Sequence, residues 1–383
     1  MPRDIIKEMK ICFLTNTLNI DSGWGRYSWE VISRINKEKN VQISVLTENF
    51  SNNFLEKPIL KNSLRNLFFI FPNAMRARKY IKQCDIIHCL DAYPYGIIAT
   101  LANIGLNKKL IINVVGSYSV APLEQVNKIT LIRWIYRKIK KELLYWAYKK
   151  ADSVPCISYF TEKEILKRID LKNTEVIHLG IDFDKFQISN FVNKKNREDK
   201  VILSVGELKK RKGYHISIPA MVDVKKKYPN FKYYIVGHQR NKSFFDELKQ
   251  LVKKHQLDNN VIFLQGISDE ELIDLYYKSD LFLLTSVNIG SHFEGFGLVF
   301  LEAGACGKPV IGTSGCGIED AIEDNFNGLL VSQNDIKKTS HVVLKILDNP
   351  DLAKRLGING KKKAQNMSWQ NTVKKYIKIY KFI

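Results

Sequence analysis

The sequence predicts an α/β fold made of two doubly wound domains, each built around a parallel sheet. Short apolar runs alternate with helix-like segments along most of the 383 residues. These runs are continuously hydrophobic, which is typical of strands covered by helices on both faces and therefore of parallel sheets. A polar stretch at 182–200 interrupts the alternation, and we expect it to be the linker between the domains.

The first domain is expected to cover residues 1–190. Its candidate strands lie at 11–16, 41–48, 85–91, 110–117, 153–158 and 174–180. Helix-like segments separate them, for example 27–37. The apolar segment that begins at Ala92 is too short and too polar to span a membrane, so we expect a buried helix there.

The second domain is expected to cover residues 198–367. Its candidate strands lie at 201–207, 231–237, 261–266, 281–286, 309–313 and 327–331. Two helices are expected to close the chain from about Ile336. Ligands of such sheets bind outside the carboxyl ends of the strands, so the loops there are the first place to look for a site.

Composition excludes several classes of protein. With 45% hydrophobic and 26% charged residues, the chain is globular rather than disordered or fibrous. Its six cysteines form no CxxC pair and its seven histidines no HxxH or HExxH motif, so we expect buried thiols and no metal site. The first residues lack the apolar core of a signal peptide, which predicts a cytoplasmic protein.

The net charge of +21 predicts an anionic partner. Two basic stretches, 57–84 and 127–150, carry apolar and aromatic residues among their cations. A basic amphipathic helix of this kind can lie on an anionic membrane surface. The alternative is an ordinary helix packed on the sheet with a solvated basic face. Nucleic acid is an unlikely partner because no RRM, KH or zinc-finger signature is present.

The segment "SHFEGFGLVFLEAGACGKPVI" contains two acids in apolar surroundings, Glu294 and Glu302. Gly295 and Gly297 fall where a loop enters a helix, so backbone N–H groups there can approach a phosphate. Glu302 lies about two turns further on, roughly 8–12 Å away, which is too far for the two acids to share a proton. They are expected to hold hydroxyls of one elongated ligand, unless the glycines only shape a turn and Glu302 forms a structural salt bridge.

The segment "EGFGLVFLEAGACGKPVIGT", continued by "GCGIEDAIEDNFNGLLV", resembles the signature of the family 4 (group 1) retaining glycosyltransferases. Other segments resemble the family in the same order, among them "SGWGRYSWEVI", "DIIHCLDAYP" and "VILSVGELKKRKGYH". The resemblance implies the GT-B fold, in which two Rossmann-like domains face a central cleft. It also implies that the last helix, 368–383, packs back on the first domain.

The resemblance assigns roles to particular residues. Glu294 would contact hydroxyls of the donor sugar, Lys212 would steady the leaving diphosphate, and Arg211 would be a further diphosphate cation. Glu302 would hydrogen-bond the ribose. The remaining donor-binding residues would be Gly23, Gly206, Gly266, Ile267, Phe296, Gly297, Leu298 and Val299.

The sequence departs from the family at two places. Glu207 follows Gly206 where many members have an arginine. Val115 and Gly116 occupy the region where members often have a histidine near the donor sugar. His88, one strand earlier, is the acceptor-side candidate, with simple packing as the alternative.

The implied activity is sugar transfer from a UDP- or GDP-sugar with retention at the anomeric carbon. The leaving diphosphate would accept the acceptor's proton, so no metal or other cofactor is expected. The acceptor would be a lipid-linked or cell-envelope glycan, in polysaccharide or lipopolysaccharide synthesis. The alternatives are another GT-B activity, such as a nucleotide-sugar epimerase or phosphorylase, or a catalytically silent binding homologue.

Overall fold

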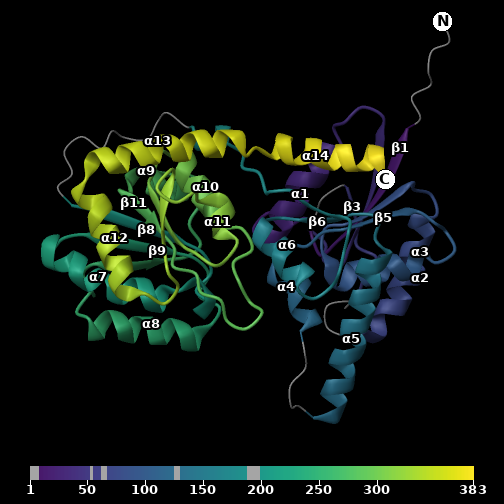
Figure 1. Cartoon of the computed structure of the whole chain (residues 1–383), viewed down its shortest axis with the longest axis horizontal. Coiled ribbons are helices and arrows are strands. Elements are labelled where there is room, and N and C mark those ends of the chain that lie inside the picture. Colours follow the sequence, from purple (N-terminus) through teal and green to yellow (C-terminus); the bar gives the residue numbers. More distant parts are fainter. Residues whose placement is uncertain (1–7, 52–54, 62–66, 125–129, 188–198) are drawn as a thin grey trace, which may run out of the picture. The chain divides into compact units, whose positions relative to one another are not determined.

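The computed structural model describes residues 8–51, 55–61, 67–124, 130–187 and 199–383. The chain forms two compact units (Figure 1). Unit 1 ends at Leu179 and resumes at Trp369, while unit 2 runs from Gly180 to Ser368. Most of the expected linker, residues 188–198, lies outside the described residues.

Unit 1 is built on a parallel sheet of five strands in the order β3-β2-β1-β4-β5. The strands are β1 (Met9–Thr15), β2 (Val41–Thr47), β3 (Glu56–Lys57), β4 (Ile86–Cys89) and β5 (Lys109–Ile112). A separate parallel pair is formed by β6 (Val154–Cys156) and β7 (Thr174–Val176). All six predicted strands are confirmed, and only β3, two residues long, was not predicted.

The helices of unit 1 follow the strands and cover the sheet. They are α1 (Gly23–Ile35), α2 (Ile70–Ile81), α3 (Ile97–Asn103), α4 (Ser117–Val120), α5 (Leu131–Lys150), α6 (Tyr159–Leu166) and α14 (Trp369–Phe382). Helix α3 is almost wholly buried, as predicted for the segment after Ala92. Helix α14 is fixed to unit 1 by hydrogen bonds, including Tyr27 Oη with Tyr376 Oη at 2.9 Å.

Unit 2 is built on a parallel sheet of six strands in the order β10-β9-β8-β11-β12-β13. The strands are β8 (Val201–Val205), β9 (Lys232–Val236), β10 (Val261–Leu264), β11 (Leu281–Leu283), β12 (Val310–Thr313) and β13 (Gly328–Val331). These are the six strands predicted for the second half of the chain.

Unit 2 has seven α-helices among the described residues, two more than the five that connect its six strands. They are α7 (Tyr214–Lys227), α8 (Lys242–Lys254), α9 (Asp269–Lys278), α10 (Leu298–Ala305), α11 (Ile318–Ala321), α12 (Ile336–Asp348) and α13 (Pro350–Asn366). The prediction of two closing helices was wrong, because α12, α13 and α14 are three. Asn349 caps α13 by accepting from the Leu352 N–H at 2.9 Å, and Pro350 occupies its first turn, so a new helix starts there.

Each main sheet has one point where the strand order reverses. It lies between β1 and β4 in unit 1 and between β8 and β11 in unit 2. Loops that leave adjacent strands at such a point diverge, which opens a crevice at the carboxyl ends where ligands bind. All six cysteines are buried, as expected. Among the described helices, none is long and apolar enough to cross a membrane.

Candidate functional site

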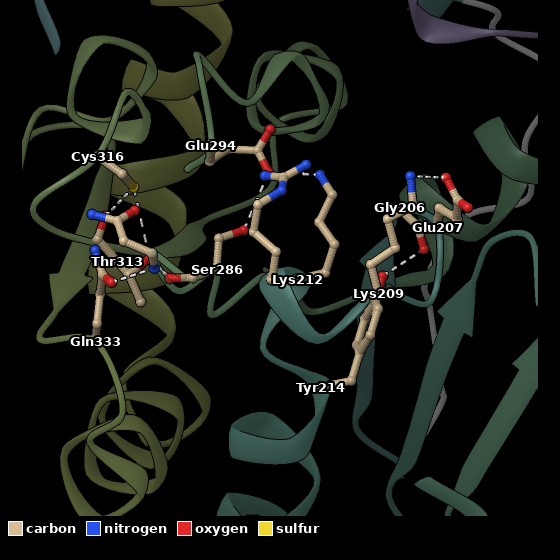
Figure 2. A network of polar contacts seen from close by, with 12 residues as sticks. Gly206, Glu207, Lys209, Lys212, Tyr214, Ser286, Glu294, Thr313, Cys316 and Gln333 are labelled. Carbon is tan, nitrogen blue, oxygen red and sulfur yellow. Dashed lines mark hydrogen bonds and ion pairs between the residues drawn. The ribbon is translucent and has the colours of Figure 1, made fainter. Parts of the chain in front are cut away.

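The candidate site lies at the carboxyl ends of β8 and β11, the reversal point of the unit 2 sheet. Gly206 follows β8, and the short helix η5 (Lys210–Lys212) leads from there into α7. Ser286 and Glu294 lie on the loop between β11 and α10. Figure 2 shows Lys212, Ser286 and Glu294 pointing toward one another. The fold thus brings together two segments that are far apart in the sequence.

The Glu294 carboxylate is held by two cations. Its Oε2 accepts hydrogen bonds from Lys212 Nζ at 2.7 Å and from Arg211 Nη1 at 2.8 Å. The Ser286 hydroxyl donates to the same oxygen at 3.3 Å. Glu294 is only 9% exposed, so these contacts form in a largely desolvated environment where charge-assisted hydrogen bonds are strong.

The side chains of this cluster shift the pKa values of one another. Burial alone would raise the pKa of the Glu294 carboxyl, but Lys212 and Arg211 more than offset it and lower the pKa to about 2. Burial lowers the pKa of the Lys212 ammonium, while Glu294 opposes that change. Glu294 is therefore charged at neutral pH, which suits a hydrogen-bond acceptor better than a proton donor. The three side chains together carry one net positive charge, which suits an anionic ligand.

Two glycines and a tyrosine hold Lys212 in position. A Cβ on Gly206, whose φ is +155°, would lie 3.2 Å from the Lys212 Cε and from the Tyr214 hydroxyl. Tyr214 Oη donates to the Gly206 carbonyl at 2.7 Å. A Cβ on Gly237, after β9, would lie 2.0 Å from that same carbonyl oxygen. Side chains at either glycine would displace the loop that carries Lys212.

Glu207 has a local partner. Its Oε2 forms an ion pair with Lys209 Nζ at 2.7 Å (Figure 2). The residue that departs from the family pattern therefore balances a neighbouring lysine on the same loop, and the contacts to Glu294 come from Arg211 and Lys212 instead.

The N-terminus of α10 follows Gly297. This residue has φ +84°, and a Cβ there would lie 2.7 Å from the Phe300 ring, so glycine is required for two reasons. Leu298 and Val299 form the first turn, whose N–H groups have no partner within the helix. Phe296 is buried beside them. These N–H groups lie at the end of the loop that carries Glu294, and their contact with a phosphate stays a prediction.

We expect Gly297→Ala to destabilise unit 2 by about 3 kcal/mol, because it adds a steric clash to a left-handed backbone. Gly290→Ala is the matched control, since Gly290 has φ +57° but open space around a Cβ. Gly290→Ala should lower the free energy of unfolding by only about 1 kcal/mol. Urea unfolding of both variants measures the difference, and equal losses would contradict the role of Phe300.

Glu302 lies on α10 and is 7% exposed. Its Oε2 accepts a hydrogen bond at 2.8 Å from the hydroxyl of Tyr276, a fully buried residue of α9. Gly266 and Ile267 lie on the loop that joins β10 to α9. Gly266 has φ +68° and no atom within 4 Å of a Cβ position, which leaves the backbone there accessible.

The two remaining candidates lie in unit 1. Gly23 is the exposed first residue of α1. His88 is fully buried, and its ring nitrogens bond to Tyr380 Oη at 2.7 Å and to Asn113 Oδ1 at 3.0 Å. Burial lowers the pKa of His88 to about 4, so the ring is neutral. These contacts favour the packing alternative for His88.

Four residues that shape the site were not predicted from the sequence: Tyr214, Tyr276, Ser286 and Gly317. Gly317 donates its N–H to the Glu294 carbonyl at 2.9 Å, and a Cβ there would lie 2.0 Å from the Gly295 carbonyl oxygen. The "GCG" at 315–317 was the available signal for this contact. Among the described residues, no group of three or more His, Cys, Asp or Glu side chains is arranged to hold a metal ion.

Two doubly wound units, with a cationic site at the reversal point of the second sheet, define a protein of the GT-B class. A model described as "Glycosyltransferase Family 4" matches residues 22–185, and one described as "Glycosyl transferases group 1" matches residues 185–363. The chain belongs to the group 1, family 4 glycosyltransferases, as the sequence resemblance predicted.

Three known proteins illustrate the relationship. An uncharacterized glycosyltransferase of Methanocaldococcus jannaschii is 25% identical over 369 residues, which are 93% of this chain and 94% of that protein. The capsular polysaccharide biosynthesis glycosyltransferase CapM of Staphylococcus aureus is 30% identical over 192 residues, 49% of this chain and 48% of CapM. The crystal structure of Anabaena HepE in complex with UDP-glucose has a TM-score of 0.79 at 17% identity, covering 98% of this chain and 100% of HepE.

Proposed function

We propose that the protein transfers a sugar from a nucleotide diphosphate sugar to a glycan acceptor, with retention at the anomeric carbon. The observation that carries this proposal is the buried Glu294 carboxylate between Lys212 and Arg211, at the reversal point of the unit 2 sheet. HepE, which has the same fold, is known in complex with UDP-glucose, and this supports a nucleotide sugar as the donor, which we expect to be a UDP- or GDP-sugar.

The chemistry of the proposed reaction suits these residues. When the bond between the anomeric carbon and the diphosphate breaks, negative charge builds up on the leaving diphosphate. Lys212, Arg211 and the N–H groups from Gly297 to Val299 stabilise that charge more in the transition state than in the ground state. A diphosphate oxygen takes the proton of the acceptor hydroxyl as that hydroxyl bonds to the same face of the carbon.

The two acids serve recognition in this scheme. Glu294 accepts hydrogen bonds from hydroxyls of the donor sugar, and Glu302 from the ribose hydroxyls. The open backbone at Gly266 and Ile267 lies against the nucleobase. An epimerase or a phosphorylase-like enzyme would form other products, and a catalytically silent homologue would form none. Analysis of the products therefore distinguishes these alternatives from sugar transfer.

The donor is tested by measuring melting temperatures with UDP, GDP, ADP and CDP and with their sugars. A nucleotide that binds the folded state stabilises it by about 2.7 kcal/mol at a hundred times its Kd. We expect UDP or GDP compounds to raise the melting temperature, and EDTA to leave transfer unchanged. Absence of any shift would contradict the donor proposal, and loss of transfer in EDTA that Mg²⁺ restores would contradict metal independence.

We further propose that unit 1 associates with an anionic membrane that presents the acceptor. Buried side chains of α5 are confined to its second half, at Leu144, Ala147 and Tyr148. Its first half exposes apolar side chains, with Ile132 81% and Ile135 44% exposed, and Figure 1 shows these turns extending from the rest of unit 1. The exposure of this half supports a membrane surface over the alternative of an ordinary helix packed on the sheet.

The other basic stretch, residues 57–84, also exposes apolar side chains among its cations. Phe68 and Phe71 are 85% and 67% exposed, next to the cations of α2. Residues 62–66 of this stretch and 127–129 of the other lie outside the described residues. Exposed apolar side chains among lysines and arginines match an anionic lipid surface.

We expect Ile132→Asp to weaken co-sedimentation with phosphatidylglycerol vesicles several-fold, because it places a charge where an apolar side chain would enter the lipid. Ile358→Asp is the control, since Ile358 is 48% exposed in α13 of unit 2 and the charge change is the same. Equal recovery of wild-type protein with neutral and anionic vesicles would contradict the membrane proposal.

A further inference from the structure

Unit 2 contains a cavity of about 230 Å³ at the edge of its sheet opposite the candidate donor site. Three lining residues directly precede strands that lie side by side, Lys200 before β8, Asp280 before β11 and Pro309 before β12. The candidate donor site lies at the carboxyl ends of β8 and β11 instead. Because β8 spans five residues, the two edges are roughly 16 Å apart. The cavity is therefore separate from the donor site.

The cavity combines an apolar floor with an opening to solvent. It lies where α12 and α13 meet at a corner of unit 2 (Figure 1). Ile346 and Leu347, at the end of α12, line it and are only 1% and 6% exposed. Pro350 and Lys354, in α13, also line it and are exposed. A small molecule can therefore enter from solvent and place an apolar part against buried side chains.

The charges that line the cavity are mostly positive. They come from the three lysines Lys200, Lys308 and Lys354 and from one acid, Asp280. Three cations against one anion leave a formal charge of +2 around the cavity. A concave wall that carries charge of one sign raises the local concentration of ions of the opposite sign. The cavity therefore suits an anionic ligand.

Two of the four charged residues have structural roles. Lys308, which is 7% exposed, donates from Nζ to the Tyr277 carbonyl at 2.6 Å, in the last turn of α9. A lysine often stabilises the end of a helix in this way. The Asp280 carboxylate accepts from the Val201 N–H at 2.7 Å. These contacts account for Lys308 and Asp280 as parts of the cavity wall.

Lys200 and Lys354 have no such role. Neither forms a hydrogen bond or a close ion pair with the part of the chain that the structure describes. The charge of Lys200 acts on Asp348, but that carboxylate forms its ion pair with Lys227, at 2.8 Å. A single solvated lysine would need no explanation. Two ammonium groups from separate segments of the chain, lining one cavity with an apolar floor, are the elements of a binding site.

The two available ammonium groups and the size of the cavity define the ligand. A phosphate monoester carries a charge of about −1.5 to −2 at pH 7, which matches two ammonium groups better than the single charge of a carboxylate. Sites for drug-sized ligands measure about 300–1,000 Å³, so this cavity is too small for a nucleotide sugar. The apolar floor favours an organic phosphate over the inorganic ion.

We propose that this cavity binds a small organic phosphate. The phosphate group lies between Lys200 and Lys354, and the apolar part of the ligand lies against Ile346 and Leu347. This site is additional to the donor site, and its assignment does not depend on the proposed transferase function.

The test is a titration of the full chain, labelled with ¹³C at its isoleucine δ1 methyl groups, with phenyl phosphate at constant ionic strength. Ile346→Val assigns the resonance of Ile346, the isoleucine that lines the cavity. We expect phenyl phosphate to shift this resonance, inorganic phosphate to bind more weakly, and phenol to leave it unchanged. Ile358, an exposed residue of α13 outside the cavity, is the internal control and should not shift.

Variants identify the cations that hold the phosphate. Lys200→Gln and Lys354→Gln should each weaken phenyl phosphate binding roughly three- to tenfold, as expected for the loss of one partly exposed ion pair. Lys345→Gln makes the same change at an exposed position of α12 outside the cavity, and should leave the affinity unchanged. Lys212→Met, which removes a cation of the candidate donor site, should also leave the Ile346 response unchanged.

Three results would overturn the proposal. The Ile346 resonance could respond to neither phosphate, which would leave the cavity without an anion. It could respond equally to phenol, in which case the cavity would select the ring and not the charge. Finally, Lys345→Gln or Lys212→Met could weaken binding as much as Lys200→Gln and Lys354→Gln, which would assign the response to net charge or to the donor site.

Discussion

Replacing Glu294 with glutamine is expected to lower sugar transfer roughly 100-fold and to destabilise unit 2 by about 2–4 kcal/mol. The amide keeps the size of the side chain but removes the charge that Lys212 and Arg211 both contact. Two largely buried cations are then left side by side without their anion. Transfer falls because those cations no longer hold their positions and because the sugar loses a charged hydrogen-bond acceptor.

The pH dependence of stability identifies the carboxylate as the cause. Because the folded pKa of Glu294, about 2, is depressed below its ordinary 4.5, the stability it contributes is present above about pH 4.5 and is lost as pH falls through 2. Chemical unfolding of wild type and Glu294→Gln should therefore differ most near neutral pH and converge in acid. Glu270→Gln, the same change at an exposed position of α9, should have no effect.

Binding experiments locate the lost contact. If Glu294 faces the sugar, the variant should bind the nucleoside diphosphate better than it binds the nucleotide sugar, relative to wild type. An unchanged ratio of the two affinities would refute the role of Glu294 in sugar recognition, even if transfer is lost.

The strands of both sheets could be predicted because each is an uninterrupted apolar run, as parallel strands buried on both faces require. The exception, β3, is two residues long, Glu56 and Lys57, and has no periodicity to detect. The closing helices were miscounted because α12 and α13 are separated only by Asn349, and an amphipathic pattern continues through such a short break. Capping by that asparagine was the local signal.

Candidate residues for the site could be chosen from the sequence, but the contacts between them could not. The spacing of Glu294 and Glu302 indicated recognition groups, yet the cations that hold Glu294 lie 82 and 83 residues earlier in the chain. Only the adjacency of β8 and β11 brings those segments together. The Tyr276 contact to Glu302 was missed for the same reason, since a tyrosine in an amphipathic helix has no sequence feature that marks a polar partner.

Replacing Lys212 with methionine is expected to lower kcat about 10²- to 10³-fold, the effect of removing one fixed donor from a site of developing negative charge. Stability should change little, because the Glu294 carboxylate keeps Arg211 at 2.8 Å and Ser286 at 3.3 Å. Steady-state kinetics with the donor found by the melting screen measures the loss. Lys210→Met, at an exposed neighbouring position, should retain full activity.

The contrast between the two variants distinguishes charge stabilisation from structural support. Glu294→Gln leaves two buried cations without a counter-ion, so it should lower both stability and activity. Lys212→Met leaves the Glu294 carboxylate paired with Arg211, so it should lower activity alone. Burial lowers the pKa of Lys212 below its ordinary 10.5, so transfer by the wild type should decline in alkali as the ammonium loses its proton. Lys212→Arg keeps its charge at any working pH, and its activity should show no such decline. A wild-type alkaline decline that persists unchanged in Lys212→Arg would remove Lys212 from the reaction and leave Arg211 as the cation that faces the diphosphate.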